Sequence, residues 1–210
     1  MKKQTVMGVL AAAACSALVF AAVALATTIE GTQGNDKGAT ALNGTEGPDT
    51  IIAKKGDDEV NALAGDDYVN AGPGNDTVNG GDGNDRLSGK AGDDLANGDD
   101  GNDQLKGKAG KDTLNGDEGD DVLTGGKEND QLFGGLGNDF LSGGKGVDQL
   151  DGGPGDDTID ARHDGKVGDD IVCGDGTDTV LAGRNDTWPD DGSCENVEVK
   201  GKAKGPKAPK

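Results

Sequence analysis

Aromatic side chains are almost absent from this chain. Its 210 residues include three Phe, one Trp and one Tyr, and large aromatic side chains supply much of the area buried in ordinary cores. A conventional globular core is therefore excluded. Basic residues are also scarce, since 20 Lys and Arg stand against 40 Asp and Glu, for a formal net charge of −20. Nucleic acid is excluded as a partner because it would be repelled, and the natural partners of such a chain are cations.

The usual catalytic residues are also missing. The chain has one histidine and three cysteines, which form no cluster for a soft metal. We expect His163 to lie on an exposed loop, although a catalytic base or a metal ligand is the alternative. No glycine-elbow serine accompanies it, and no Lys-Ser or Lys-Thr follows the glycines to make a phosphate loop. The carboxylates are many but equivalent, so none is singled out for acid–base chemistry, and we expect no enzyme.

The one long apolar run lies at the N-terminus. Two lysines precede an apolar stretch from Val6 to Leu25, which ends in the Ala-Leu-Ala form of a cleavage site. This pattern predicts a secretory signal peptide over residues 1–26, a mature chain that begins near Thr27, and an extracellular location. A retained membrane anchor is the alternative, because the run is about long enough to span a bilayer. A lipidated Cys15 is less favoured because the apolar run continues past it.

A nonapeptide repeat fills residues 44–160. Glycine dominates positions 1 and 4, an aliphatic residue occupies position 8, and aspartate occupies position 6 in all thirteen copies. Glu128 once replaces the glycine of position 4, and Ala96 once replaces the large aliphatic of position 8. The thirteen aspartates are Asp49, Asp58, Asp67, Asp76, Asp85, Asp94, Asp103, Asp112, Asp121, Asp130, Asp139, Asp148 and Asp157.

A period of nine fits neither a helical stripe nor an alternating strand. It predicts a coil in which positions 7 to 9 form a short strand and the glycine-rich positions 1 to 6 form a turn. Two repeats make one lap, with strands on two opposite faces and the aliphatic side chains between them. Because laps stack about 4.8 Å apart, thirteen repeats would make an all-β solenoid roughly 31 Å long.

The recurrence of aspartate at position 6 needs its own explanation, because stacking places each carboxylate beside the carboxylate two repeats along the chain. Like charges about 5 Å apart repel each other, and a divalent cation between them reverses the effect. Calcium suits best, since it takes six to eight oxygen ligands in irregular shells and accepts main-chain carbonyls beside carboxylates. We predict that the position 6 aspartates bind calcium and that the chain is disordered until calcium folds it.

The segments GGLGNDFLS, AGPGNDTVN, GGDGNDRLS and GGPGDDTID follow the pattern G-G-x-G-x-D-x-U-x. This pattern resembles the calcium-binding nonapeptide of the repeat-in-toxin (hemolysin-type) family. The resemblance implies a right-handed parallel β-roll with calcium held between turns by the position 6 aspartates and glycine-rich carbonyls. Thirteen repeats would then hold about eleven ions. We expect a weaker calcium shell near Glu128 and a thinner core at Ala96.

The segments on either side of the repeats are expected to close the coil. Residues 27–43 hold a degenerate first repeat and an N-terminal cap, and residues 161–199 hold irregular repeats and a C-terminal cap. In a secreted protein the pair Cys173 and Cys194 is most often a disulfide, with a redox-active pair as the rival. Residues 200–210 form a basic tail that we expect to be disordered; contact with an anionic cell-wall or matrix polymer is an open alternative.

These features favour a secreted calcium-binding protein with a structural or binding role outside the cell. A cell-envelope or matrix adhesin that uses the calcium-stiffened rod is the main alternative. In the family that the chain resembles, such repeats often follow a hydrolase domain. Because about 17 residues lie between the predicted cleavage site and the first full repeat, an accessory module of a secreted hydrolase is less favoured. We expect the protein to be a monomer.

Overall fold

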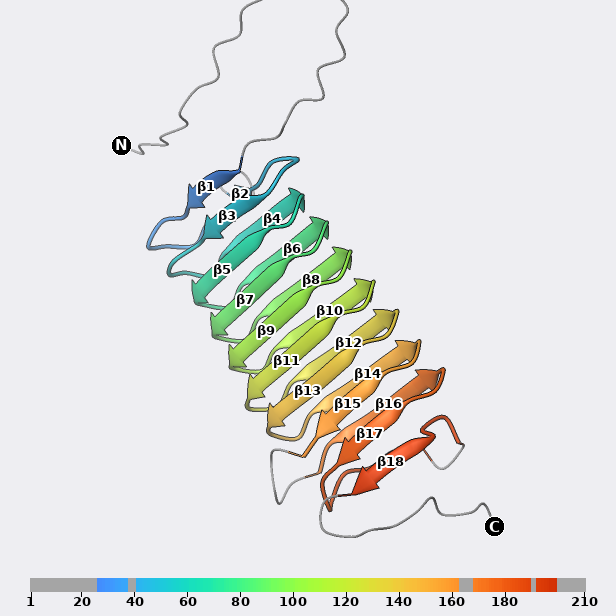
Figure 1. The fold of residues 1–210 in the computed structure, drawn as a ribbon. Coiled ribbons are helices and arrows are strands. Elements are labelled where there is room, and N and C mark those ends of the chain that lie inside the picture. Colours follow the sequence, from blue (N-terminus) through green and yellow to red (C-terminus); the bar gives the residue numbers. More distant parts are fainter. Residues whose placement is uncertain (1–25, 38–40, 163–167, 190–191, 200–210) are drawn as a thin grey trace, which may run out of the picture.

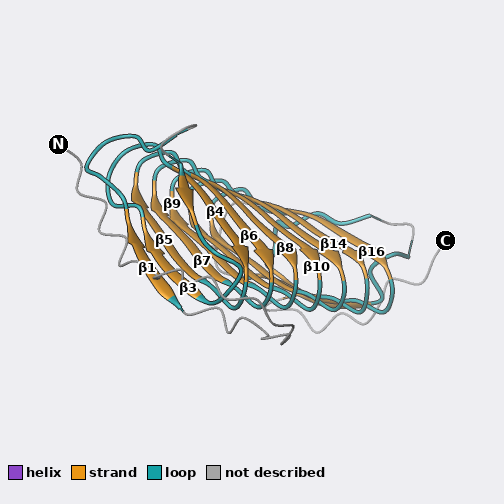
Figure 2. Ribbon diagram, turned by 90° about the horizontal axis from the view of Figure 1, so that it is seen from above, coloured by secondary structure: helices purple, strands orange, loops and turns teal. Residues whose placement is uncertain are grey.

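The computed structural model describes residues 26–37, 41–162, 168–189 and 192–199. Over these residues the chain winds into a solenoid of short parallel strands (Figure 1). One sheet, called sheet A here, has ten strands in the order β1-β3-β5-β7-β9-β11-β13-β15-β17-β18. The other, sheet B, has eight strands in the order β16-β14-β12-β10-β8-β6-β4-β2. The predicted all-β solenoid is confirmed, and Figure 2 shows its strands stacked side by side along the coil.

The strands of sheet A are β1 (Thr27–Glu30), β3 (Asp49–Ile52), β5 (Tyr68–Pro73), β7 (Arg86–Ala91), β9 (Gln104–Ala109), β11 (Val122–Lys127), β13 (Phe140–Lys145), β15 (Thr158–Ala161), β17 (Thr179–Ala182) and β18 (Asn196–Val199). The strands of sheet B are β2 (Leu42–Asn43), β4 (Glu59–Ala64), β6 (Thr77–Asp82), β8 (Leu95–Asp100), β10 (Thr113–Glu118), β12 (Gln131–Leu136), β14 (Gln149–Pro154) and β16 (Asp170–Asp175). In Figure 1 the arrows of the two sheets point in opposite directions across the coil.

Most strands are longer than predicted. A typical strand such as β6 has six residues and covers positions 7 to 9 of one repeat and 1 to 3 of the next. The reason is that backbone pairing between laps continues past position 9; for example, the Gly74 N–H donates to the Ala91 carbonyl at 2.8 Å. Positions 4 to 6 therefore make the whole turn, and the three-residue strand predicted from the sequence was too short.

The core is one column of aliphatic side chains on each sheet. Strands pair with the strand two along the chain, so that Val78 lies beside Ala96 and Ala96 beside Leu114. Position 8 is fully buried or nearly so throughout the repeats. Ala96 is 2 % exposed between these two larger neighbours, so the core is thinner there, as predicted.

The terminal segments lengthen the coil as well as closing it. At the N-terminal end, Ile29 of β1 packs against the core. At the C-terminal end, Trp188, Val197 and Val199 do the same. Ten strands spaced about 4.8 Å apart make a rod of roughly 43 Å, longer than the repeats alone predicted. The predicted disulfide between Cys173 and Cys194 is confirmed, and Cys194 is also packed against the core.

Some predictions fall on segments that the structure does not describe. These are the signal peptide up to residue 25, His163 and the basic tail at 200–210. Within the described segments, none of the secondary structure is a helix long and apolar enough to cross a membrane.

Candidate metal centre

The thirteen position 6 aspartates form two columns, one in each line of turns. The column that leads into sheet A contains Asp49, Asp67, Asp85, Asp103, Asp121, Asp139 and Asp157. The column that leads into sheet B contains Asp58, Asp76, Asp94, Asp112, Asp130 and Asp148. All thirteen are buried, with at most 4 % of any one exposed. Carboxylates are rarely buried so completely unless something pairs with them.

Each aspartate contacts the next member of its column. The backbone N–H of Asp85 donates to Oδ1 of Asp103 at 2.7 Å, and the N–H of Asp103 donates to Oδ1 of Asp121 at 2.7 Å. The same bond recurs along both columns. The structure thus brings together the carboxylates two repeats apart that the sequence predicted to be neighbours. One oxygen of each carboxylate is satisfied by the backbone of the preceding lap.

The second oxygen, Oδ2, has no hydrogen-bond partner in twelve of the thirteen predicted aspartates, from Asp58 to Asp157. The same holds for Asp169 and Asp178. A buried carboxylate oxygen without a donor is costly and requires an explanation. Fourteen such atoms in two regular columns indicate a repeated ligand rather than scattered defects.

A main-chain carbonyl of the next lap lies close to several of these Oδ2 atoms. A Cβ placed on Gly80, at position 1, would stand well under 3.0 Å from both Asp85 Oδ2 and the Gly98 carbonyl of the next lap. Gly116 has the same relation to Asp121 Oδ2 and the Gly134 carbonyl. Glycine at position 1 therefore keeps a small oxygen-lined space open between successive laps.

This donor set fits a hard cation. The nearby atoms are carboxylate and carbonyl oxygens, which are the ligands that calcium prefers. Among the described residues, no group of three or more His, Cys, Asp or Glu side chains gathers to hold a metal. The aspartates meet two at a time within a column, so the other ligands must come from the main chain.

Burial raises the pKa of the column carboxylates. For Asp85 and Asp94, burial and the neighbouring carboxylates outweigh a backbone hydrogen bond and raise the pKa to about 7. For Asp130 the pKa is raised to about 8, by burial first and then by Asp112, Asp148 and Glu128. Without a counter-charge these groups resist ionisation near neutral pH. The Glu128 carboxylate adds to the rise in the pKa of Asp130. This is the region where the sequence predicts a weaker calcium site.

The turns depend on glycine at position 4. From Gly56 onward these glycines have φ between 120° and 151°, a region that side chains with a Cβ rarely adopt. A Cβ on Gly101 would also collide with the Gly83 carbonyl. Glu128 takes φ 70° at this position, and its Oε2 accepts a hydrogen bond from the Gly110 N–H at 3.0 Å.

Asp49 differs from the other predicted ligands. Its Oδ1 accepts hydrogen bonds from the N–H and hydroxyl of Thr27, and its Oδ2 from those of Thr45. Burial raises its pKa most, but these four bonds outweigh it, and the pKa of Asp49 is lowered overall. The first carboxylate of the sheet A column is thus satisfied by threonines rather than left free.

The columns also continue past the predicted repeats. The N–H of Asp148 donates to Asp169, and the N–H of Asp157 donates to Asp178, each at 2.9 Å. Asp186 and Glu195 extend the columns by one more step. Sequence reasoning missed these residues as members of the columns because the nine-residue spacing breaks after position 160. An acid two residues before a core residue, as in Asp169 and Ile171, was the signal that could have found them.

A family model described as the RTX calcium-binding nonapeptide repeat, in four copies, matches overlapping parts of the chain. The matched residues are 43–78, 64–96, 79–114, 97–132, 106–141 and 124–159. Together they span more than half of the chain and include all thirteen predicted aspartates. No curated protein matches the chain.

Proposed function

Because the chain belongs to the family of the RTX calcium-binding nonapeptide repeat, and its repeats therefore bind calcium, we propose that it is a secreted calcium-dependent rod without catalytic activity. In this proposal the coil forms when calcium enters the two aspartate columns. The role of the protein is then mechanical or adhesive contact outside the cell, where free calcium is high.

The observation that carries this proposal is the set of fourteen buried Oδ2 atoms without a hydrogen-bond partner. Seven belong to each column, so each column has six gaps between neighbouring carboxylates of this set. One ion per gap gives about twelve ions, against the eleven expected from the thirteen repeats. The difference arises because Asp49 is satisfied by threonines, whereas Asp169 and Asp178 extend the columns.

The folded coil needs calcium to offset the repulsion between its stacked carboxylates. In its absence the folded chain must either keep stacked carboxylates ionised and close together or protonate them. Extracellular calcium modules bind with Kd values of about 0.1 to 1 mM, so that at about 1 mM free calcium each site adds roughly 0.4 to 1.4 kcal/mol. Several such sites together decide whether a coil with so thin a core is folded.

The first test is a calcium titration of residues 27–210, followed by calorimetry and circular dichroism. We expect an unordered spectrum in chelator and a β spectrum at millimolar calcium, with heat absorbed or released until about twelve ions are bound. Magnesium at the same concentration is the matched control, because it demands a tighter octahedral shell. A full β spectrum in chelator would contradict the proposal.

A pair of variants locates the ions. Asp121→Asn keeps the size of a buried column residue but removes its charge, and we expect a loss of about two ions because the residue borders two gaps. Asp120→Asn changes its exposed neighbour in the same turn and is expected to leave the stoichiometry unchanged. Equal losses in the two variants would show that the column does not bind the ions.

Export and the absence of catalysis have tests of their own. The proposal of export is supported by the basic and apolar N-terminal segment and by β1, which begins at Thr27, the residue predicted to follow the cleavage site. N-terminal sequencing of protein recovered from the culture medium is expected to begin at Thr27. A panel of ester, peptide and glycoside substrates is expected to show no calcium-dependent turnover.

A further inference from the structure

The middle strands of sheet A and the strands of sheet B carry opposite charge on their outer surfaces. Strands β7, β9, β11 and β13 of sheet A contain six basic residues and no acid: Arg86, Lys90, Lys106, Lys108, Lys127 and Lys145. The described strands of sheet B contain nine acids and no base: Glu59, Asp82, Asp99, Asp100, Asp117, Glu118, Asp151, Asp170 and Asp175. The overall negative charge of the chain conceals this separation, because alternate repeats lie on opposite faces.

The charges form rows in which like charges are direct neighbours. On sheet A, Lys90 lies beside Lys108, and Lys127 lies beside Lys145. On sheet B, Asp100 lies beside both Asp82 and Glu118. Like charges directly opposite each other in a sheet are destabilising. Each row therefore raises the energy of the isolated coil and would be stabilised by a row of opposite charge.

A second acidic row on sheet B shows this repulsion. Asp99 lies beside Asp117, and burial and then the Asp117 carboxylate raise the pKa of Asp99. Two ion pairs of the described residues, Lys54 with Glu30 and Arg162 with Asp160, include no member of these rows. The described part of the chain thus gives no ion-pair partner to the row residues Lys90, Lys108, Lys127, Lys145, Asp82, Asp99, Asp100, Asp117 and Glu118.

We propose that the basic face of sheet A binds the acidic face of sheet B on a second copy of this chain, so that calcium-loaded rods stack face to face. The two rows match in spacing because both are generated by the same eighteen-residue lap. An offset of one lap along the rod, about 4.8 Å, again places lysines opposite carboxylates. Few unrelated partners would have this period.

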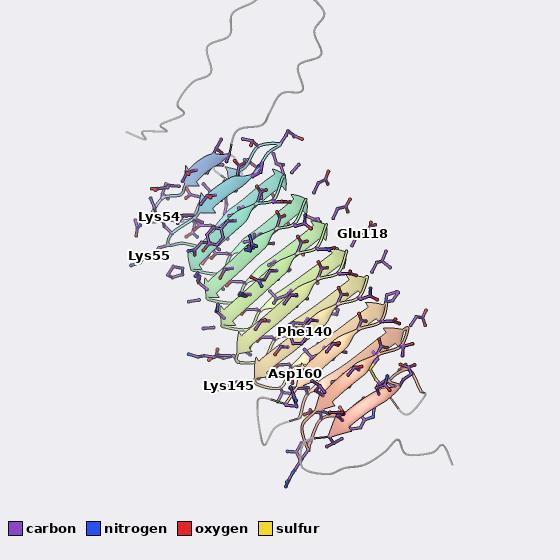
Figure 3. All side chains as sticks on the ribbon, in the orientation of Figure 1. Lys54, Lys55, Glu118, Phe140, Lys145 and Asp160 are labelled. Atoms are coloured by element: carbon purple, nitrogen blue, oxygen red, sulfur yellow. A yellow bond between two sulfur atoms is a disulfide. The ribbon has the colours of Figure 1, made fainter. Side chains whose placement is uncertain are left out.

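The position of the rows sets the orientation. The lysine row lies at the C-terminal ends of the sheet A strands and the acidic row at the C-terminal ends of the sheet B strands. Figure 3 shows Lys54, Lys55 and Lys145 on one long side of the coil and Glu118 on the opposite side. The rows therefore meet when the two rods are antiparallel, with Lys108 and Lys127 of one copy over Glu118 and Asp100 of the other.

The contact approaches the size of a specific interface. At full overlap, the eight strands of sheet B, seven of six residues and one of two, cover roughly 700 Å² at a spacing of about 4.8 Å, somewhat less than the roughly 800 Å² per partner of a standard complex. Exposed apolar side chains lie on both faces, with Val122 and Phe140 on sheet A and Leu95 and Phe133 on sheet B. Because the two surfaces differ, the contact does not close on itself, and each rod can add a further copy.

Stacking requires the calcium-loaded coil and so rests on the proposed function. Bound calcium also lowers the net negative charge that would keep two copies apart. The monomer expected from the sequence is then the form found at high salt, where charges on separate surfaces are screened.

The test is sedimentation velocity of the mature protein in 1 mM calcium, with circular dichroism on the same samples. We expect species that grow with concentration at about 20 mM salt and a monomer at about 300 mM salt. A β spectrum with only monomer at low salt would overturn the stacking and leave calcium-dependent folding intact. Loss of the β spectrum itself would instead count against the proposed function.

Charge reversal makes the test specific. Lys108→Glu/Lys127→Glu and Asp100→Lys/Glu118→Lys are each expected to weaken association at least tenfold, since like charges then face each other. An equimolar mixture of the two variants is expected to restore association. Lys111→Glu/Arg184→Glu gives the same net charge as the first variant, changes exposed residues outside the sheet A strands, and is expected to associate like the wild type. Two outcomes would overturn the proposal. The first is association of the Lys108→Glu/Lys127→Glu variant alone, which would show that calcium bridges acidic faces. The second is a mixture of the two charge-reversal variants that stays monomeric.

Discussion

Six residues at position 2 of the repeat have a left-handed backbone although they are not glycine. They are Lys54, Leu63, Lys90, Asp99, Lys108 and Asp117, with φ between 69° and 92°. Apart from Thr45, the other residues at this position are glycine, for example Gly81, which pairs with Leu63 in the ladder. A residue with a Cβ in this region costs of order 1 kcal/mol or more. The repeat therefore tolerates local strain at six of its position 2 residues, five of which carry a charge.

Leu63→Gly is expected to stabilise the folded protein by about 1 kcal/mol, because glycine adopts this backbone without strain. Leu63 is 44 % exposed, so little packing is lost. Leu95→Gly is the matched control, since Leu95 is also an exposed leucine, at 36 %, but it is not among the residues with positive φ. It is expected to destabilise by about 0.5 to 1 kcal/mol. Calcium-saturated thermal unfolding would measure both, and a change of the same sign in the two variants would refute the strain argument.

The column carboxylates make the metal-free coil sensitive to pH. In the folded state the pKa of Asp85 is about 7 and that of Asp130 about 8. In the unfolded chain the pKa of an aspartate is about 3.9. Because the folded pKa is the higher one, protonation favours the coil; this stabilisation is complete below the unfolded pKa and is lost as pH rises through about 6 to 8. In chelator, the β signal in circular dichroism is expected to increase from pH 8.5 to pH 5. A signal that falls on acidification would contradict this expectation.

Thr27, the residue predicted to follow the signal-peptide cleavage site, contacts the first aspartate of the sheet A column. Its backbone N–H lies 2.8 Å from Asp49 Oδ1, so cleavage after Ala26 would place a charged ammonium against that carboxylate. A chain that begins at Thr27 is expected to be more stable than one with a Gly-Ser extension by about 1 kcal/mol, the order of a charge-assisted bond at a partly exposed site. Unfolding of both chains would show the difference, and Asp49→Asn should abolish it.

At the level of the strand, stability comes from one inward side chain in each repeat. In β11 Leu123 is fully buried, whereas its neighbour Val122 is 36 % exposed. The outward residues pair only with their equivalents on the next laps, such as Val122 with Gln104 and Phe140. Because each strand buries so little hydrophobic area, the loss of its one large inward side chain should destabilise the coil.

Leu123→Ala is therefore expected to cost about 2 to 5 kcal/mol at saturating calcium, through the lost contacts and the cavity that remains. Val122→Ala, one residue away, is expected to change stability by no more than about 0.5 kcal/mol. Urea unfolding monitored by circular dichroism would separate the two. A similar effect of both would mean that the core column does not hold the laps together.

Considered as a whole, the molecule is a stack of laps whose two ends must be closed. The C-terminal end is covered by Trp188, Val197 and Val199 and is tied to β16 by the Cys173–Cys194 disulfide. Open ends of a solenoid expose strand edges and core, and capping is needed to protect them. The disulfide closes a loop of about twenty residues, which in the loop-entropy account is worth roughly 3 kcal/mol.

Cys173→Ser/Cys194→Ser is expected to weaken the C-terminal end before the centre. Hydrogen exchange in calcium should show lost protection in β16 to β18 with protection retained in β7 to β11, because each lap depends mainly on its neighbours. Uniform loss across the coil would show instead that the molecule unfolds as a single unit.

The sequence alone determined the repeat, its phase, the parallel solenoid, the buried aliphatic column and the aspartate columns. These follow from a strict nine-residue period, because position in such a coil decides which residues face inward and which lie beside one another. The cysteine pair was predictable for a different reason: once Cys15 is assigned to the predicted signal peptide, two cysteines remain and allow one pairing. Where the period breaks, after residue 160, that reasoning stopped, and the column members Asp169 and Asp178 were missed.

Only the tertiary structure decided how far backbone pairing extends and which oxygens it uses. Strand length depends on hydrogen bonds between laps, which no single repeat contains, so the six-residue strands could not be read from local composition. Of the two threonines that satisfy Asp49, Thr45 lies four residues away in the same repeat, whereas Thr27 is 22 residues away in sequence and reaches the carboxylate only because the laps stack. The separation of charge between the faces likewise appears only when alternate repeats are placed on opposite sheets, because it is a property of the stacked laps and not of the average composition.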